Sequence, residues 1–221
     1  DIDFPLIKEF KNTKNFLTPK ISLRYSPNDT KSLINETRLL NTDNIFSLNR
    51  IGFDETVEGG ASLTVGLDFD KKRKDTNDTF FSSKIATVFR EQENENLPVT
   101  STLNKKQSDF VGEIILNPLK NFQFSYNYLI DSHLNKVNLH SFENKFIVNN
   151  FVNTFTFYEE NNLIGNNSYY ENKSTLNLNN NSSISFKTRE NKKENLTEYY
   201  NLIYEYKNDC LVASLRYNKD Y

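Results

Sequence analysis

The chain has 221 residues, of which 36% are hydrophobic, and a formal net charge of −2. Such a balanced charge offers no broad basic face, so the composition argues against a nucleic-acid-binding protein. The mean hydropathy of −0.69 is low for a soluble globular core, but 18 Phe and 12 Tyr are too many aromatic residues for a disordered chain. No apolar run of about 18 residues occurs, so we expect no transmembrane helix.

Alternation of apolar and polar residues is the main pattern along the chain, and it predicts strands. The clearest example is Phe122–Ile130, where Phe122, Phe124 and Tyr126 alternate with polar residues. The predicted strands, in chain order, are Asp3–Phe10, Leu17–Ser26, Ala61–Phe69, Phe80–Arg90, Ser108–Asn117, Phe122–Ile130, Lys136–Ile147, Phe151–Glu159, Ser168–Leu178, Ser182–Arg189, Glu194–Tyr206 and Cys210–Lys219. Most have about 8–12 residues, which is longer than the ~5–6 of soluble domains and close to the roughly 9–11 of a tilted membrane-spanning strand.

The connections between these strands alternate in length. Short turns are expected at 117–121, 148–150, 179–181 and 207–209, and longer connections at 27–60, 91–107 and 160–167. The connections at 70–79, 131–135 and 190–193 do not fit the alternation. Short turns at one end and long loops at the other are typical of outer-membrane barrels.

The predicted fold is therefore all-β, a transmembrane antiparallel up-and-down β-barrel with a polar, wet interior. We expect residues 1–221 to form part of a single barrel domain, about twelve strands of a larger barrel, because the sequence begins and ends within the pattern. A soluble β-sandwich also has alternating strands and is the main alternative. A surface β-solenoid is less favoured, because no repeat of 20–50 residues is visible.

The stretch Asn44–Gly60 is unusual because it holds three of the six glycines of the chain. It ends the longest predicted loop, at the point where the next strand begins. We expect glycine here to allow positive φ and close backbone packing, and our hypothesis is that charged side chains tie this loop to the inner wall as a lid by ion pairs. The residues expected to order the loop are Asn49, Arg50, Asp54, Glu58, Gly59 and Gly60, with the ion pairs assigned to Arg50, Asp54 and Glu58.

Catalytic and metal-binding patterns are weak. His133 and His140 are the only histidines, and their spacing fits no zinc signature. The pairs Asp54-Glu55 and Glu159-Glu160 could bind divalent cations, and Lys71–Lys74 could contact an anionic lipid or a partner domain, but solvated charges are the favoured interpretation of all three. We expect no enzyme activity, no cofactor and no metal site.

Five segments, in order over nearly the whole chain, carry a family resemblance: Leu17–Pro27, Ile34–Phe69, Phe89–Gln92, Ser108–Asn121 and Tyr204–Tyr217. The most specific pieces are SLNR…D…EGG in the second segment and the late strand turn that contains the only cysteine. Together they resemble the barrel of the outer-membrane lipopolysaccharide-assembly family LptD. The sequence departs from the family in its many asparagines and at Ile51-Gly52, where relatives often have an aromatic or glycine pair.

The resemblance implies a function in the outer membrane of a Gram-negative bacterium. Such a barrel receives lipopolysaccharide from an LptA-like periplasmic bridge and delivers it to the outer leaflet, with an LptE-like lipoprotein plugging the lumen. The family's N-terminal periplasmic jellyroll is not present in residues 1–221. The resemblance also implies that Cys210 forms a disulfide with a cysteine outside these residues; the alternative is an inert, partly buried thiol. A general porin or a TonB-dependent receptor, and a barrel enzyme with a Ser/His/Asp site, are the other functions to weigh.

Overall fold

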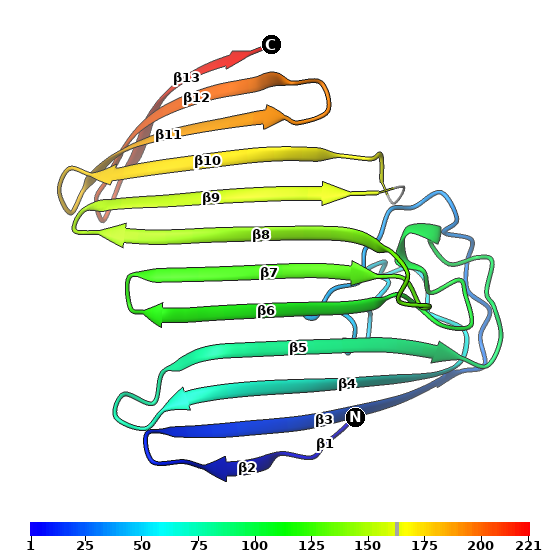
Figure 1. Ribbon diagram of the computed structural model, residues 1–221. Coiled ribbons are helices and arrows are strands. Elements are labelled where there is room, and N and C mark those ends of the chain that lie inside the picture. The colour runs from blue at the N-terminus through cyan, green and yellow to red at the C-terminus, as the bar shows by residue number, and fades with distance from the viewer. Residues whose placement is uncertain (162–163) are drawn as a thin grey trace.

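The computed structural model describes residues 1–161 and 164–221 and is all-β (Figure 1). Its thirteen strands form one antiparallel sheet. The strands are β1 (Ile2–Asp3), β2 (Leu6–Glu9), β3 (Thr13–Ser26), β4 (Gly60–Arg73), β5 (Thr79–Arg90), β6 (Phe110–Leu119), β7 (Phe122–Ile130), β8 (Val137–Val148), β9 (Phe151–Glu160), β10 (Ser168–Asn177), β11 (Ser182–Asn191), β12 (Leu196–Lys207) and β13 (Val212–Asp220). The one helical element in the described part is a 3₁₀ turn, η1 (Val99–Ser101).

Each strand from β3 onward pairs with the next one in the sequence, so the sheet is an up-and-down meander. β1 and β2 lie on the same side of β3 in one common register, Ile2 opposite Ile21 and Leu6 opposite Leu17. They are two parts of one strand, interrupted at Pro5, which has no N–H to donate. The predicted strand Asp3–Phe10 corresponds to this pair.

The two ends of the described sheet do not pair with each other. The path of neighbouring strands runs from β1 to β13 and stops there. β13 is exposed along its whole length. The described residues therefore form an open sheet and not a closed barrel; the sequence had predicted about twelve strands of a larger barrel. No helix in the described part of the chain is long and apolar enough to cross a membrane.

The predicted alternation of connections is confirmed for the long connections, while 192–195 at the loop end is as short as the turns 178–181 and 208–211 (Figure 1). One end of the sheet, which we call the turn end, has the connections 74–78, 120–121, 149–150, 178–181 and 208–211. The opposite loop end has 27–59, 91–109, 131–136, 161–167 and 192–195.

The prediction of a long connection at 70–79 was wrong because β4 continues to Arg73. Its basic residues stay in the strand, where their side chains lie over aromatic rings: Lys72 over Phe16 and Lys71 over Phe80, at 5.1 and 5.5 Å from the ring centroids. Such cation–π contacts favour an ordered strand over a solvated turn.

The two faces of the sheet differ in chemistry. One, which we call the polar face, carries ion pairs between neighbouring strands: Lys20–Asp68 at 2.7 Å, Lys84–Glu113 at 3.2 Å and Lys187–Glu171 at 3.0 Å. The other, the apolar face, alternates with it along every strand. Large hydrophobic side chains stand exposed on the apolar face, among them Leu23, Tyr25, Leu67, Ile85, Leu116, Ile184, Phe186, Leu202, Tyr204, Leu215 and Tyr217.

The hydrophobic core lies on the polar face at the loop end. Connections 27–59 and 91–109, which we call the cap, pack there against the sheet (Figure 1). The core consists of Leu33, Leu40, Ile45, Ile51, Leu97 and Leu103 from the cap and Ala86, Val88, Val111, Leu129 and Leu139 from β5 to β8. The two connections also bind each other, since Leu33 N donates to Asn96 O at 2.7 Å and Asn94 Nδ2 to Thr30 Oγ1 at 2.9 Å.

Candidate functional site

A buried ion-pair cluster fixes the cap to the sheet. Arg50, from the cap, has a fully buried side chain, and that of Glu58 is only 7% exposed. Arg50 Nε donates to Glu58 Oε2 at 2.6 Å, and Arg50 Nη2 donates to Glu58 Oε1. This two-pronged geometry is the strongest form of arginine–carboxylate contact.

The same guanidinium reaches the wall of the sheet. Arg50 Nη1 donates to Thr64 Oγ1 at 2.7 Å, and Nη2 donates to Ser62 Oγ at 2.9 Å. Both hydroxyls project from the polar face of β4. The hydroxyls satisfy donors that would otherwise be buried without partners, which is costly.

Two further arginines, from β3 and β5, complete the cluster. Arg90 Nη1 pairs with Glu58 Oε1, and Arg90 Nη2 donates to Gly59 O at 2.5 Å. Arg24 Nη1 lies 3.8 Å from Glu58 Oε2, and Arg24 Nη2 donates to the carbonyls of Phe46 and Ser47 at 3.1 and 2.5 Å. The Glu58 carboxylate thus joins the cap to β3 and β5, and the Arg50 guanidinium joins it to β4 between them.

The environment of Glu58 keeps its carboxyl group ionised. Burial alone would raise the pKa of Glu58, but the hydrogen bonds and charge of Arg50, together with the charges of Arg90 and Arg24, outweigh burial and lower that pKa below its ordinary value. The cluster is therefore in its charged form at neutral pH.

The lowered pKa of Glu58 predicts a pH dependence for the cap. The charged carboxylate stabilises the attached cap at all pH values above the ordinary glutamate pKa of about 4.3, and this contribution is lost as the pH falls through the lower pKa of the folded protein. We expect hydrogen exchange in residues 27–59, corrected for intrinsic rates, to be constant from about pH 8 to 5 and to accelerate below about pH 4. In Glu58→Gln the acceleration should be absent; an identical acid response in that variant would contradict the assignment.

Gly59 and Gly60 allow the chain to enter β4 beside this cluster. A Cβ on Gly59 would collide with the backbone oxygen of Asn28 and come within 3.2 Å of Thr30 N. The Gly59 amide donates to Thr30 Oγ1 at 2.9 Å. Gly60 has a φ of +83°, which L side chains rarely adopt. The concentration of glycine in this stretch therefore has a steric cause.

Replacement of Gly59 by alanine is expected to loosen the cap. The added methyl group would have to displace backbone rather than a flexible side chain, at a cost of about 1–3 kcal/mol. Hydrogen exchange measured by mass spectrometry should rise throughout residues 27–59. Gly165→Ala is the matched control, because the nearest atom to its Cβ would be Asn167 Nδ2 at 3.6 Å. Equal exchange in both variants and the parent protein would contradict the prediction.

The expected ordering residues divide into two groups. Arg50, Glu58, Gly59 and Gly60 meet at the cluster. Asn49 instead orders a local turn: its Nδ2 lies 3.3 Å from Asp54 Oδ1, and its Oδ1 accepts from Gly52 N at 3.0 Å. The expected ion pair of Asp54 is absent among the described residues, because Asp54 is exposed in that turn and its recorded partner is Asn49.

Sequence reasoning missed two members of the cluster. Arg24 and Arg90 look like ordinary polar positions of alternating strands, opposite Leu23 and Phe89. The alternation does place both on the polar face. It cannot show which loop residue they meet, because Glu58 lies 34 positions from the first and 32 from the second (58 − 24 and 90 − 58).

The other singled-out residues lie apart from this cluster. His140 Nε2 is 3.0 Å from Glu159 Oε2 on the apolar face, and His133 is exposed in a loop. Glu55 pairs with Lys31 at 3.0 Å, while Glu160 accepts from Ile164 N at 2.8 Å and so orders its own connection. No group of three or more His, Cys, Asp or Glu side chains in the described ranges could hold a metal ion.

Cys210 lies in the connection 208–211 at the turn end, opposite the cap. It is a free, exposed cysteine, and its backbone N–H donates to Asn208 Oδ1 at 3.0 Å. The thiol is therefore free, as the alternative expected, but exposed and not partly buried; the disulfide remains a prediction. β13 begins at Val212, two residues later than predicted, because this asparagine-capped turn includes Cys210.

No protein-family model and no curated protein matches this sequence.

Proposed function

We propose that this chain is part of the wall of an outer-membrane β-barrel that assembles lipopolysaccharide in the outer leaflet. The proposal of a membrane location rests on one observation: the apolar face of the sheet is exposed and the polar face is the one that is partly covered. In a soluble sandwich the apolar faces are covered by each other. Here the apolar face is exposed, and the cap lies on the polar face. An apolar exterior with a polar interior is the arrangement of a transmembrane barrel.

The open sheet supports a barrel wall with more strands than residues 1–221 provide. Strand edges carry unpaired N–H and C=O groups, which cannot be left bare in lipid. β13 and the β1–β3 edge of the sheet therefore require further strands, and a polar face with many charged residues favours a wide lumen over a tightly packed small barrel. In this proposal the cap lies outside the cell and the turn end in the periplasm, and the alternation of connections supports this orientation because outer-membrane barrels have short periplasmic turns and longer extracellular loops.

The lipopolysaccharide part rests on the sequence resemblance. In this proposal the polar lumen accommodates the sugars, a weakly paired seam elsewhere in the wall releases the lipid chains, and an LptE-like lipoprotein fills the interior. The SLNR…D…EGG stretch supports it indirectly, because its arginine, glutamate and glycines build the buried anchor of the cap. The proposal puts Cys210 on the periplasmic side, where a disulfide to a periplasmic domain could form because that compartment is oxidising.

Depletion of the protein in its host tests this function. We expect surface lipopolysaccharide to fall while the lipid accumulates on the periplasmic side. A porin or a TonB-dependent receptor would leave surface lipopolysaccharide unchanged on depletion, and that result would overturn the proposal. Non-reducing gels of wild type and Cys210→Ser test the disulfide: we expect a mobility difference that reductant removes.

A further inference from the structure

A hollow at the turn end lies where the sheet is locally split. β5 and β6 are in register only from Phe81–Leu116 to Ala86–Val111. Beyond Leu116 a bulge displaces Asn117 and Pro118, and register with β7 resumes at Leu119. The hollow has a volume of about 510 Å³ and is bordered by the ends of β4 to β8.

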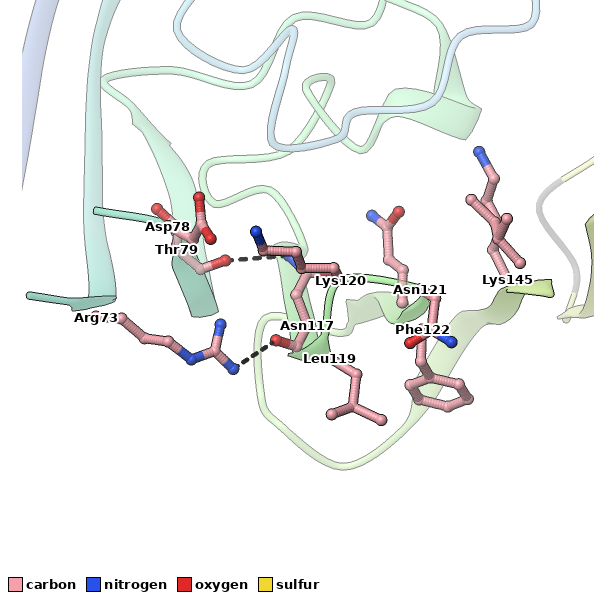
Figure 2. A pocket seen from close by; sticks show the side chains of 11 residues that line it. Arg73, Asp78, Thr79, Asn117, Leu119, Lys120, Asn121, Phe122 and Lys145 are labelled. Carbon is pink, nitrogen blue, oxygen red and sulfur yellow. Dashed lines mark hydrogen bonds between the residues drawn. The ribbon is translucent and has the colours of Figure 1, made fainter. Parts of the chain in front are cut away.

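Three cations surround this hollow, as Figure 2 shows: Arg73, Lys120 and Lys145. The single carboxylate among the lining residues is that of Asp78, so the formal charge of the lining is +2 (three positive and one negative). Neither lysine takes part in any ion pair of the described residues. Two ammonium groups without acidic partners beside one hollow favour an anion there.

Arg73 is held in place before any ligand binds. Its Nη2 donates to Asn117 O at 3.2 Å and Pro118 O at 2.6 Å, and its guanidinium lies 4.9 Å from the Phe80 ring centroid. Figure 2 shows it directed toward the strand end that carries Asn117. A fixed guanidinium with spare N–H groups suits phosphate, whose oxygens accept several hydrogen bonds in one plane.

The hollow also joins the two faces of the sheet. Lys145 and Gln123 face each other in the β7–β8 ladder on the polar face, and Phe122 belongs to the apolar face. Leu119, which is 64% exposed, lies opposite Phe122 in the β6–β7 ladder. Arg73, opposite Thr13 in the β3–β4 ladder, lies toward the apolar face. Cations from both faces and exposed apolar carbon around one hollow match a molecule with an anionic head and an apolar tail.

We propose that this hollow binds the phosphate group of an anionic amphiphile, with Arg73, Lys120 and Lys145 as its ligands. Leu119 and Phe122 contact the first carbons of the apolar part. The proposal rests on the proposed function only in placing the turn end at a membrane surface. Phospholipids and phosphorylated glycolipids share this chemistry, and the experiment distinguishes them.

Native mass spectrometry of the full-length protein in neutral detergent measures the binding. The probes are dioleoylphosphatidylglycerol, a bis-phosphorylated glucosamine glycolipid and inorganic phosphate. We expect Lys120→Gln with Lys145→Gln to weaken binding of one or both lipids at least about tenfold, since each charge-assisted contact is worth roughly that much. Lys105→Gln with Lys136→Gln is the matched control, because it removes two exposed lysines at the loop end.

The outcomes separate the claims. Weakening in the first double variant alone supports the site, and the lipid that is affected identifies the source of the phosphate. Equal lipid binding by parent, site variant and control would overturn it. If inorganic phosphate displaced the lipids at concentrations equal to theirs, the apolar contacts would contribute nothing to binding. That result would overturn the claim that the ligand is an amphiphile. None of these results depends on surface lipopolysaccharide, so a failure here and a failure of the proposed function are distinguishable.

Discussion

Replacing Arg50 by methionine is expected to release the cap from the sheet. Methionine keeps much of the length of the side chain but leaves Glu58 without its two-pronged partner and Thr64 without its donor. Breaking a buried ion pair typically costs about 3–5 kcal/mol, and we expect the lower end here because Arg90 still pairs with Glu58. Limited proteolysis of the folded protein should then cut within residues 27–59, and we expect the same residues to resist cleavage in the parent.

The matched control is the exposed ion pair of the same loop. Lys31 and Glu55 also lie 3.0 Å apart, but their side chains are 65% and 84% exposed. Solvent screens such a pair, so Lys31→Met should leave the cleavage pattern unchanged. In the proposed outer-membrane barrel, we expect Arg50→Met to admit large antibiotics that the parent and Lys31→Met exclude. Equal proteolysis of the two variants would show that the buried cluster does not hold the cap.

An arginine on the apolar face is expected to destabilise the protein folded in a bilayer, whereas an arginine on the polar face is not. Phe124 and Ser125 are neighbours in the middle of β7 and face opposite sides of the sheet. A charge that faces lipid near the midplane of a barrel costs about 2–4 kcal/mol. Ser125→Arg points toward water in the lumen, so its cost should be small.

Folding into lipid vesicles, followed by urea titration, compares these variants. We expect Phe124→Arg to lower the urea midpoint clearly and Ser125→Arg to remain near the parent. A larger loss in Ser125→Arg would mean that the faces are assigned the wrong way round, and equal losses would argue for a protein that is buried on both faces.

The strands were predictable because the alternation of apolar and polar residues that defines them lies within each segment of the sequence. β7 has the predicted bounds, Phe122–Ile130, since five apolar or aromatic residues at period two leave one register that separates the faces. The end of β4 was not predictable in the same way. The basic residues there resemble a solvated turn, and the aromatic side chains that order them, Phe16 and Phe80, come from neighbouring strands.

Only part of the cap structure could be predicted from the sequence. The glycines and charges of Asn44–Gly60 predicted an ordered loop, because glycines at crowded positions and charges with buried partners are visible in the composition. The sequence did not indicate the partners of Glu58 on β3 and β5, because Arg24 and Arg90 would show the same alternation on any solvated polar face. The apolar residues on the polar face beneath the cap, such as Val88 and Leu129, also look like ordinary strand residues until the cap is placed over them.

The central claim is that the apolar face meets lipid and the polar face meets water, and single-cysteine labelling along β7 tests it most directly. In a Cys210→Ser background, cysteines at 122, 124, 126 and 128 should carry a fluorophore that lipid-soluble quenchers reach and aqueous iodide does not. Cysteines at 123, 125 and 127 should show the reverse. Quenching by iodide at all seven positions, or with the opposite alternation, would contradict a membrane-spanning wall.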